Sequence, residues 1–250
     1  MRVLPCWLLL LMLLFVAGTS HADGLADLRT TLTTLNGSAP ITARLSVQKN
    51  SKNGDADEPK AMSAQSAVIA NAGPNGMQIS YDAATLDKVE AEANQRSTDT
   101  EATTPLADLL RDITPTQVNA MLSFAGPLLR RLEQASLKAD AADTLEGKPA
   151  RLLTFEVPLN VSKKDRDSMK EYTGILKVWL DGDGTPLAID QQQVFSGRRM
   201  LISFKGSNSE TATLSREGER LVMVRQKRGQ SFSGFGQIGD SSTTTTLTIQ

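Results

Sequence analysis

Cysteine and histidine are almost absent from this chain of 250 residues, where Cys6 and His21 are the only members of their types. Both lie in residues 1–22, so the remaining sequence contains neither a thiol nor an imidazole. This absence excludes Ser-His-Asp and Cys-His nucleophilic sites, zinc sites with histidine or thiolate ligands, and a structural disulfide. We therefore expect a protein that is not an enzyme, with no catalytic residue, no metal site and no cofactor.

An excess of charge and a supply of aromatic side chains are also lacking. Residues 23–250 carry 26 basic and 28 acidic side chains, and aromatic residues make up 4% of the chain. Proteins that bind nucleic acid need basic patches, so we expect no nucleic-acid partner. Because aromatic residues are few, side chains on which a sugar ring could stack are also scarce.

The first 22 residues have the pattern of an export signal. Arg2 supplies the positive charge, Trp7 to Val16 form the apolar run, and Ser20 and Ala22 are small residues at the positions read by a signal peptidase. The run is shorter than the ~20 residues that span a bilayer, which favours cleavage after Ala22 over a retained anchor. Export of a protein that has no cysteine after its leader predicts a periplasmic protein of a Gram-negative envelope.

The sequence after the leader predicts one helix followed by short strands. Leucines at helical spacing indicate an amphipathic helix over residues 25–35, and residues 41–48 alternate as in a half-buried strand. Residues 50–60 are polar and predict a hairpin loop. Further strands are expected over residues 63–70 and 77–81.

The middle of the chain predicts a helical insertion at about residues 83–138. Thr114 to Gln117 form a capping box, with Pro115 at the first helical position. Gly126 and Pro127 are expected to break this helix and allow a second one, which carries Lys138 on its outer side. Residues 95–104 are expected to be a polar connection.

From Ala141 onward the pattern is almost entirely that of strands joined by short turns. Short connections imply antiparallel neighbours, because parallel strands need long crossovers. The strands are expected over residues 152–157, 174–180, 187–195, 200–204, 211–215, 220–225 and 243–249. The fold class is therefore α+β, a single domain over residues 23–250 in which about ten strands form a strongly curled, unclosed half-barrel covered by a few helices.

Two motifs suggest chemistry that their context does not support. Gly234 to Gly239 spell G-x-G-x-x-G, but strand-forming residues follow where a dinucleotide site needs a helix. Asp181 to Gly184 resemble the start of a calcium loop, yet Pro186 and Gln192 stand where an EF-hand needs glycine and glutamate. We interpret the first as a bend or bulge and the second as a hairpin turn.

Two basic clusters, residues 163–170 and 225–228, are interpreted as solvated loops or strand ends. The alternative is contact with a partner protein or with anionic lipid head groups, which would make binding sensitive to salt.

Several predicted strands carry apolar residues on both faces. This pattern fits either a second face covered by loops or an incompletely filled apolar cavity between the sheet and the central helices. The candidate ligand-binding residues are Met121, Leu122, Leu129, Leu132, Ile175, Trp179 and Leu201. Simple core packing is the alternative role for all seven.

The succession of a leader, an amphipathic helix, the strands ITARLSVQ and GMQISYD, central helices, and the run GILKVWLDGDGTPLAIDQQQVF then RRMLISF resembles the LolA/LolB superfamily of periplasmic lipoprotein carriers. The resemblance implies a curled, unclosed antiparallel sheet covered by helices, with an apolar cavity for the acyl chains of lipoproteins in transit. The expected partner is then a hydrophobic ligand or acylated lipoprotein.

Three functions remain open at this point. The first is a periplasmic carrier or binder of an acylated or otherwise hydrophobic ligand. The second is a non-enzymatic envelope sensor or scaffold that recognises an envelope protein through its surface. The third is a carboxylate-based hydrolase, because 28 acidic residues are present although none has a recognisable apolar context. We expect a monomer in each case.

Overall fold

The computed structural model describes residues 24–250, so the predicted leader lies outside the described residues. Ten strands form one antiparallel sheet with the order β3-β2-β1-β10-β9-β8-β7-β6-β5-β4, as predicted for class and approximate strand number. The strands are β1 (Ile41–Asp55), β2 (Lys60–Gly73), β3 (Gly76–Tyr81), β4 (Ser136–Leu145), β5 (Lys148–Glu156), β6 (Met169–Leu180), β7 (Pro186–Arg199), β8 (Ile202–Glu217), β9 (Arg220–Gly234) and β10 (Gln237–Ile249). The sheet is open, with β3 and β4 at its edges.

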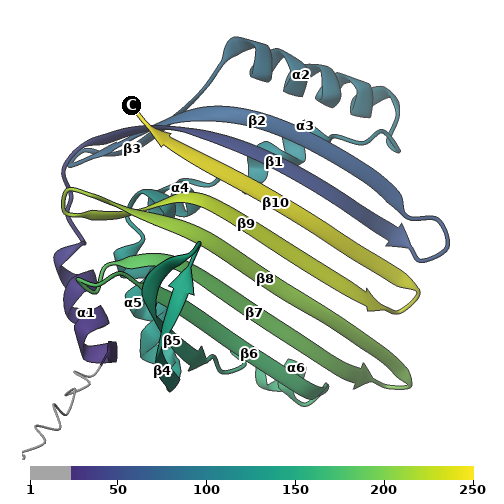
Figure 1. The fold of residues 1–250 in the computed structure, drawn as a ribbon. Helices are drawn as coiled ribbons and strands as arrows, with labels where there is room; N and C mark the ends of the chain where they lie inside the picture. Colours follow the sequence, from purple (N-terminus) through teal and green to yellow (C-terminus); the bar gives the residue numbers. More distant parts are fainter. Residues whose placement is uncertain (1–23) are drawn as a thin grey trace, which may run out of the picture.

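The pairing of β1 with β10 joins a first meander, β1 to β3, to a second meander, β4 to β10 (Figure 1). Leu45 lies opposite both Val68 of β2 and Leu247 of β10, so this row of apolar side chains crosses three strands. Strands that lie next to each other in the second meander are joined by short turns, except between β5 and β6. The last strand of the chain thus completes the sheet beside the first.

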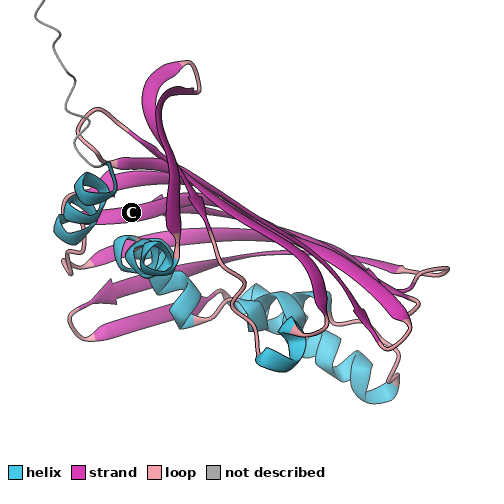
Figure 2. Cartoon of the chain, turned by 90° about the horizontal axis from the view of Figure 1, so that it is seen from below, coloured by secondary structure: helices cyan, strands magenta, loops and turns pink. Residues whose placement is uncertain are grey.

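The helical segment covers one face because it must cross the sheet. It leaves the edge strand β3 and returns at the opposite edge strand β4, and its helices gather on one side of the strands (Figure 2). The described helices are α1 (Gly24–Thr34), α2 (Ala83–Thr98), α3 (Pro105–Asp112), α4 (Pro115–Leu122), α5 (Ala125–Gln134) and the short α6 (Lys163–Arg166). We call the face under α3, α4 and α5 the helix-covered face and the other the open face.

Alternating burial along the strands assigns side chains to these two faces. In β6, Leu176, Val178 and Leu180 are buried, while the alternate residues Ile175 and Trp179 are more exposed. The buried series lies on the helix-covered face, where Leu128 and Leu132 of α5 belong to the same core cluster. The main core is therefore a layer between the sheet and the helices.

Several predicted strand boundaries are wrong. The predicted loop at residues 50–60 is mostly strand, because β1 continues to Asp55 and β2 begins at Lys60. These strand ends are polar on both faces, so they lack the hydrophobic alternation that identifies a strand. The predicted strands at residues 200–204 and 211–215 belong to one strand, β8, and Met200 with Leu201 forms the turn before it.

The helical insertion also differs in detail from the prediction. The first predicted helix ends at Leu122, so Gly126 and Pro127 do not break it but lie in the first turn of α5. Proline is compatible with this position because its missing N–H has no intrahelical partner in the first turn. Lys138 lies in β4 rather than on a helix, and residues 95–98 extend α2 into the predicted connection.

The two glycine-rich motifs lie in hairpin turns. Gly234 to Gly239 span the turn between β9 and β10, so no helix follows the glycines. Gly236 has a φ of 75° there, a conformation that glycine adopts readily. Asp181 to Gly184 connect β6 to β7, and the Asp183 carboxylate accepts a hydrogen bond of 2.8 Å from the Thr185 N–H. The predicted hairpin turn at Asp181 to Gly184 is confirmed, whereas Gly234 to Gly239 enclose a hairpin turn instead of the predicted bend or bulge.

Candidate functional site

A cavity of about 250 Å³ lies between the helix-covered face and the helices α3 and α4. Strands β1, β9 and β10 supply its floor. Its apolar lining consists of Leu45, Val47, Leu109, Ile113, Val118 and Met121. Its polar lining consists of Lys49, Asp112, Gln117, Gln226, Arg228, Gln230, Ser241, Thr243 and Thr245. The cavity is thus amphipathic.

The strand register arranges this lining as rows of increasing polarity. Leu45 pairs with Leu247, and two residues further along β1, Val47 pairs with Thr245. The next row joins Lys49 of β1 to Thr243 of β10, which in turn pairs with Arg228 of β9. Because alternate residues share a face, the cavity floor changes from apolar to cationic along a few residues of each strand.

The apolar wall of the cavity comes from the junction of α3 and α4. Leu109 is fully buried, and Ile113 and Val118 on either side of the turn are nearly so. The Thr114 hydroxyl accepts a hydrogen bond of 3.2 Å from the Gln117 N–H, which confirms the predicted N-cap. The cap begins α4 at Pro115 and so positions Val118 and Gln117 at the cavity.

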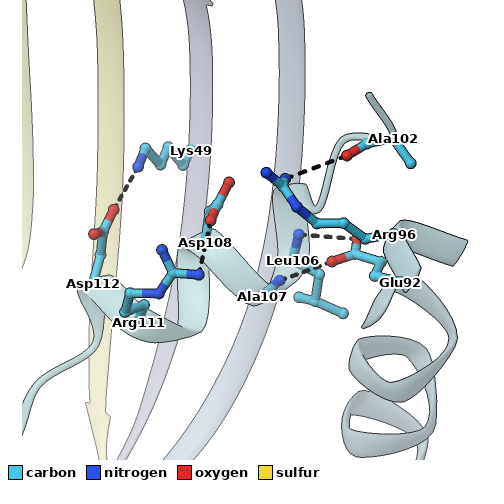
Figure 3. Close-up of polar contacts among 9 residues, drawn as sticks. All are labelled: Lys49, Glu92, Arg96, Ala102, Leu106, Ala107, Asp108, Arg111 and Asp112. Atoms are coloured by element: carbon cyan, nitrogen blue, oxygen red, sulfur yellow. Dashed lines mark hydrogen bonds and ion pairs between the residues drawn. The ribbon is translucent and has the colours of Figure 1, made fainter. Parts of the chain in front are cut away.

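An ion pair between Lys49 of β1 and Asp112 at the end of α3 stands at the edge of the cavity (Figure 3). On the same helix, Arg111 pairs with Asp108 at 3.2 Å. Both Lys49 and Asp112 also line a neighbouring hollow of about 390 Å³. The ion pair therefore lies between two adjoining spaces and is partly exposed to solvent.

The opposite end of α3 is fixed by α2, as Figure 3 shows. The two oxygens of the Glu92 carboxylate accept hydrogen bonds from the N–H groups of Leu106 (3.0 Å) and Ala107 (2.9 Å). A carboxylate in this position satisfies unpaired donors and interacts favourably with the helix dipole. Arg96 donates to the Ala102 carbonyl at 3.3 Å, so α2 contacts the α3 region through polar groups. Helix α2 itself contains no buried residue.

A carboxylate on the sheet orients the cationic side of the cavity. Glu210 of β8 accepts hydrogen bonds from Arg131 of α5 at 2.9 Å and from the Gln226 amide at 2.6 Å, and Arg228 lies 3.9 Å away. Burial alone would raise the pKa of Glu210, but the two guanidinium groups and the hydrogen bonds hold its pKa below the ordinary value. Glu210 thereby anchors Arg131, while Arg228 reaches the cavity.

The seven predicted ligand residues do not converge on this cavity. Met121 lines it, whereas Leu122 and Leu132 are fully buried in the core and Leu129 packs partly buried against that core. Leu201 is 83% exposed in the turn between β7 and β8.

Ile175 and Trp179 lie on the open face, away from the central helices. The Trp179 indole N–H donates to Asp143 of β4 at 2.9 Å, and the ring lines a separate hollow of about 500 Å³ beneath the β4–β5 hairpin. Emission of Trp179 would therefore report on the open face rather than on the cavity.

Sequence reasoning missed Leu109 and Ile113 because it did not identify α3. A signal was present, since Leu106, Leu109 and Leu110 recur at helical spacing after Pro105. The polar partners Arg228 and Glu210 had no such signal, because their proximity depends on the pairing of β8 with β9.

A larger hollow, of about 740 Å³, lies between α1 and the β4–β5 hairpin. Its central Arg151 donates to Asp140 at 2.7 and 2.6 Å and lies 3.4 Å from Asp27. The hydrogen bonds from Arg151 to Asp140 raise the pKa of the guanidinium. The charged groups at the centre of this hollow therefore pair with one another, and none of its lining residues comes from α3, α4 or α5.

Within residues 24–250, no group of three or more acidic, cysteine or histidine side chains is placed to hold a metal ion. None of the helices in this part of the chain is long and apolar enough to cross a membrane. No family model matches the sequence, and no curated protein matches it significantly.

Proposed function

We propose that this protein is a periplasmic carrier or binding protein for an acylated or otherwise hydrophobic ligand, and that the cavity between the sheet and helices α3 and α4 holds the ligand. The observation that carries the proposal is the polarity gradient across the cavity. Leu45, Leu109 and Met121 line one side, and Lys49 and Arg228 lie on the other. This arrangement fits an amphiphile with an acyl segment and an anionic head group.

The size of the cavity limits how such a ligand is held. About 250 Å³ is slightly below the roughly 300–1,000 Å³ of typical ligand sites. A long acyl chain would therefore extend beyond the cavity. The adjoining hollow of about 390 Å³ shares Lys49, Asp112 and Ser241 with it and offers the space.

The energetics of acyl transfer favour this function. Each buried methylene supplies about 0.8 kcal/mol, so even a partly buried chain provides a substantial gross driving force before ordering costs.

The proposal includes a strongly curled sheet whose concave side is the helix-covered face. The resemblance of the sequence to periplasmic lipoprotein carriers supports the same function, and fold analogy alone would not carry it.

A titration with cis-parinaric acid, a naturally fluorescent fatty acid, tests the proposal. We expect saturable binding that Arg228→Gln weakens about tenfold, because the carboxylate loses a cationic partner. Lys227→Gln is the matched control, since Lys227 neighbours Arg228 in β9 but lies on the open face. Equal effects of the two substitutions, or no saturable binding, would overturn the proposed site.

A neutral fatty alcohol of the same length tests whether Arg228 recognises the charged head group and not the acyl chain. It should displace parinaric acid from the wild type and from Arg228→Gln with similar affinity, because it has no charge for Arg228 to recognise. If Arg228→Gln bound the alcohol as much more weakly than the wild type as it binds the acid, the substitution would have damaged the cavity as a whole.

The second candidate function is a non-enzymatic envelope sensor or scaffold. It is favoured by the complete burial of Leu122, Leu128 and Leu132, which leaves most of the helical layer as ordinary core. This function predicts no amphiphile binding, together with specific capture of one envelope protein by the folded surface.

A further inference from the structure

The turns β7–β8 and β9–β10 present large apolar side chains to solvent at one end of the sheet. Met200 is 92% exposed, Leu201 83%, Ile202 46% and Phe235 45%. The rings of Phe204 and Phe235 stack with their centroids 6.2 Å apart, which joins the two turns into one surface. We call Met200, Leu201, Ile202 and Phe235 the apolar tip.

Folding does not account for the residues at this tip. Met200 and Phe235 have φ values of 55° and 59°, a region that glycine and asparagine adopt at much lower cost. In the other turns of the same sheet, positive φ is adopted by glycines such as Gly147 and Gly218 or by the polar residue Glu146, and not by large apolar residues. The apolar tip thus carries side chains that are unfavourable both for the turn and for exposure to water.

Basic side chains surround the apolar tip. Arg198 and Arg199 precede Met200, and the Arg198 N–H donates to the Ser168 carbonyl at 2.8 Å, which holds the segment around α6 beside the turn. Residues 163–171 and 198–205 together contain seven basic and three acidic side chains. In the described part of the chain, none of these seven basic groups forms an ion pair within 4 Å of a carboxylate; the pairs that do form involve other cations.

We propose that the apolar tip and its basic surroundings dock the protein onto a bilayer that contains anionic phospholipid. Met200, Leu201 and Ile202 enter the interfacial region, while Arg198 and Arg199 contact phosphate groups. A bilayer fits better than a protein partner because the tip protrudes and neither Met200 nor Leu201 lines any of the hollows described above.

Charge along this end of the sheet sets the orientation of docking. The β1–β2 turn lies at the same end of the molecule (Figure 1) and contains Asp55, Asp57 and Glu58. An anionic surface repels these carboxylates and attracts the α6 side. The protein therefore approaches the bilayer by the corner that carries the β7–β8 turn.

Vesicle flotation measures this interaction directly. The species that begins at Asp23 is used, because it retains the whole described fold and lacks the apolar run of the leader, which would itself bind lipid. We expect flotation with phosphatidylcholine vesicles that contain phosphatidylglycerol, weaker flotation at high salt, and little with phosphatidylcholine alone. The double variant Met200→Ser/Leu201→Ser should bind at least about tenfold more weakly.

Matched variants separate docking from general effects. Arg198→Gln/Arg199→Gln should weaken binding about fivefold for each cation removed and reduce its salt dependence. Leu86→Ser, which removes a 51% exposed leucine from α2, and Lys52→Gln/Lys60→Gln, which removes the same charge near the acidic turn, should bind like the wild type. Unchanged binding of the tip variants, equal losses in the controls, or no flotation of the wild type would overturn the proposal. None of these results depends on parinaric acid binding, which the tip variants should retain.

Discussion

Glu210 is the residue that links the helical layer to the cationic side of the cavity. Its carboxylate is 14% exposed and interacts with Arg131 from a helix and with Gln226 and Arg228 from the next strand. Arg131 also lies 5.4 Å from the centre of the Phe124 ring and donates to Gln191. Replacing one carboxylate oxygen by an amide N–H would leave either the buried Gln226 amide or the partly buried Arg131 guanidinium without its acceptor, which costs more than the lost hydrogen bond itself contributes.

Glu210→Gln should therefore lower the free energy of unfolding by about 2 kcal/mol at neutral pH. The pKa of Glu210 is lower in the folded state than its ordinary value of 4.5, so its contribution is complete above that value and disappears as the pH falls through the folded-state pKa. The variant should accordingly lose less stability in acid than the wild type. Urea unfolding at neutral and acidic pH measures both effects, with the exposed Glu133→Gln as the control. Parallel pH dependence in wild type and Glu210→Gln would contradict this assignment.

Truncation of Met121 and of Leu132 compares a residue that lines the cavity with a residue of the filled core. Leu132 is fully buried in the core cluster, so Leu132→Ala should cost about 2–5 kcal/mol. Met121→Ala enlarges an existing cavity and should cost less, while it changes amphiphile affinity. Thermal unfolding and parinaric acid titration of both variants check this difference. Two variants with equal destabilisation and unaltered binding would assign Met121 to the core.

At the scale of elements, α3 is a short helix that buries Leu109 in the core and is held at both ends by polar contacts. Glu92 of α2 binds its first N–H groups, and Asp112 at its last turn pairs with Lys49 of the sheet. Helix α2 has no buried residue of its own, so little apolar burial opposes its separation from the sheet. Helix α2 does not line the cavity but supports α3, which does, so we expect the cavity wall to open most readily where α2 holds α3.

Glu92→Gln should therefore increase amide hydrogen exchange in α2 and α3 and leave the strands unchanged. A neutral amide accepts hydrogen bonds less strongly than a carboxylate and loses the interaction with the helix dipole. Glu90→Gln is the matched control, since Glu90 is exposed on the same helix. Uniform exchange changes across the sheet would show that Glu92 supports the whole fold and not only the attachment of α2 to α3.

Sequence patterns predicted the elements whose side chains alternate between core and solvent, and failed where both faces are polar. The strand from Ile41 was recognised by its buried alternate residues, but its continuation through Asn50 to Asp55 was interpreted as a loop. Met200 and Leu201 were placed in a strand because apolar residues usually indicate burial, whereas here they form an exposed turn. Local chemistry was more reliable, as the Thr114 cap shows.

At the scale of the whole molecule, the candidate site depends on contacts that no local pattern reveals. Lys49 and Arg228 reach one cavity because β10 lies between β1 and β9. The order of the strands decides which residues share a face with the helices, and it follows from long-range pairing of the first and last strands. Of the seven predicted ligand residues, only Met121 of α4 lies at the cavity.

Removal of metal ions should leave the thermal stability of the protein unchanged. The carboxylates of the turn at Asp181 and Asp183 accept hydrogen bonds from backbone N–H groups, and the bond from Thr185 lowers the pKa of Asp183. Thermal unfolding with and without a chelator should give the same midpoint, because the turn needs no ion to satisfy these oxygens. A large loss of stability on chelation would indicate an oxygen-ligand metal site that includes this turn.

Native mass spectrometry of the purified protein tests the central claim most directly. We expect the wild type to carry an additional mass that corresponds to a lipid or fatty acid, or to acquire one when amphiphile is added. Met121→Trp fills the cavity and should remain without the adduct, while Leu86→Ser should keep it. A wild type that stays at its bare polypeptide mass in the presence of excess amphiphile would contradict the account.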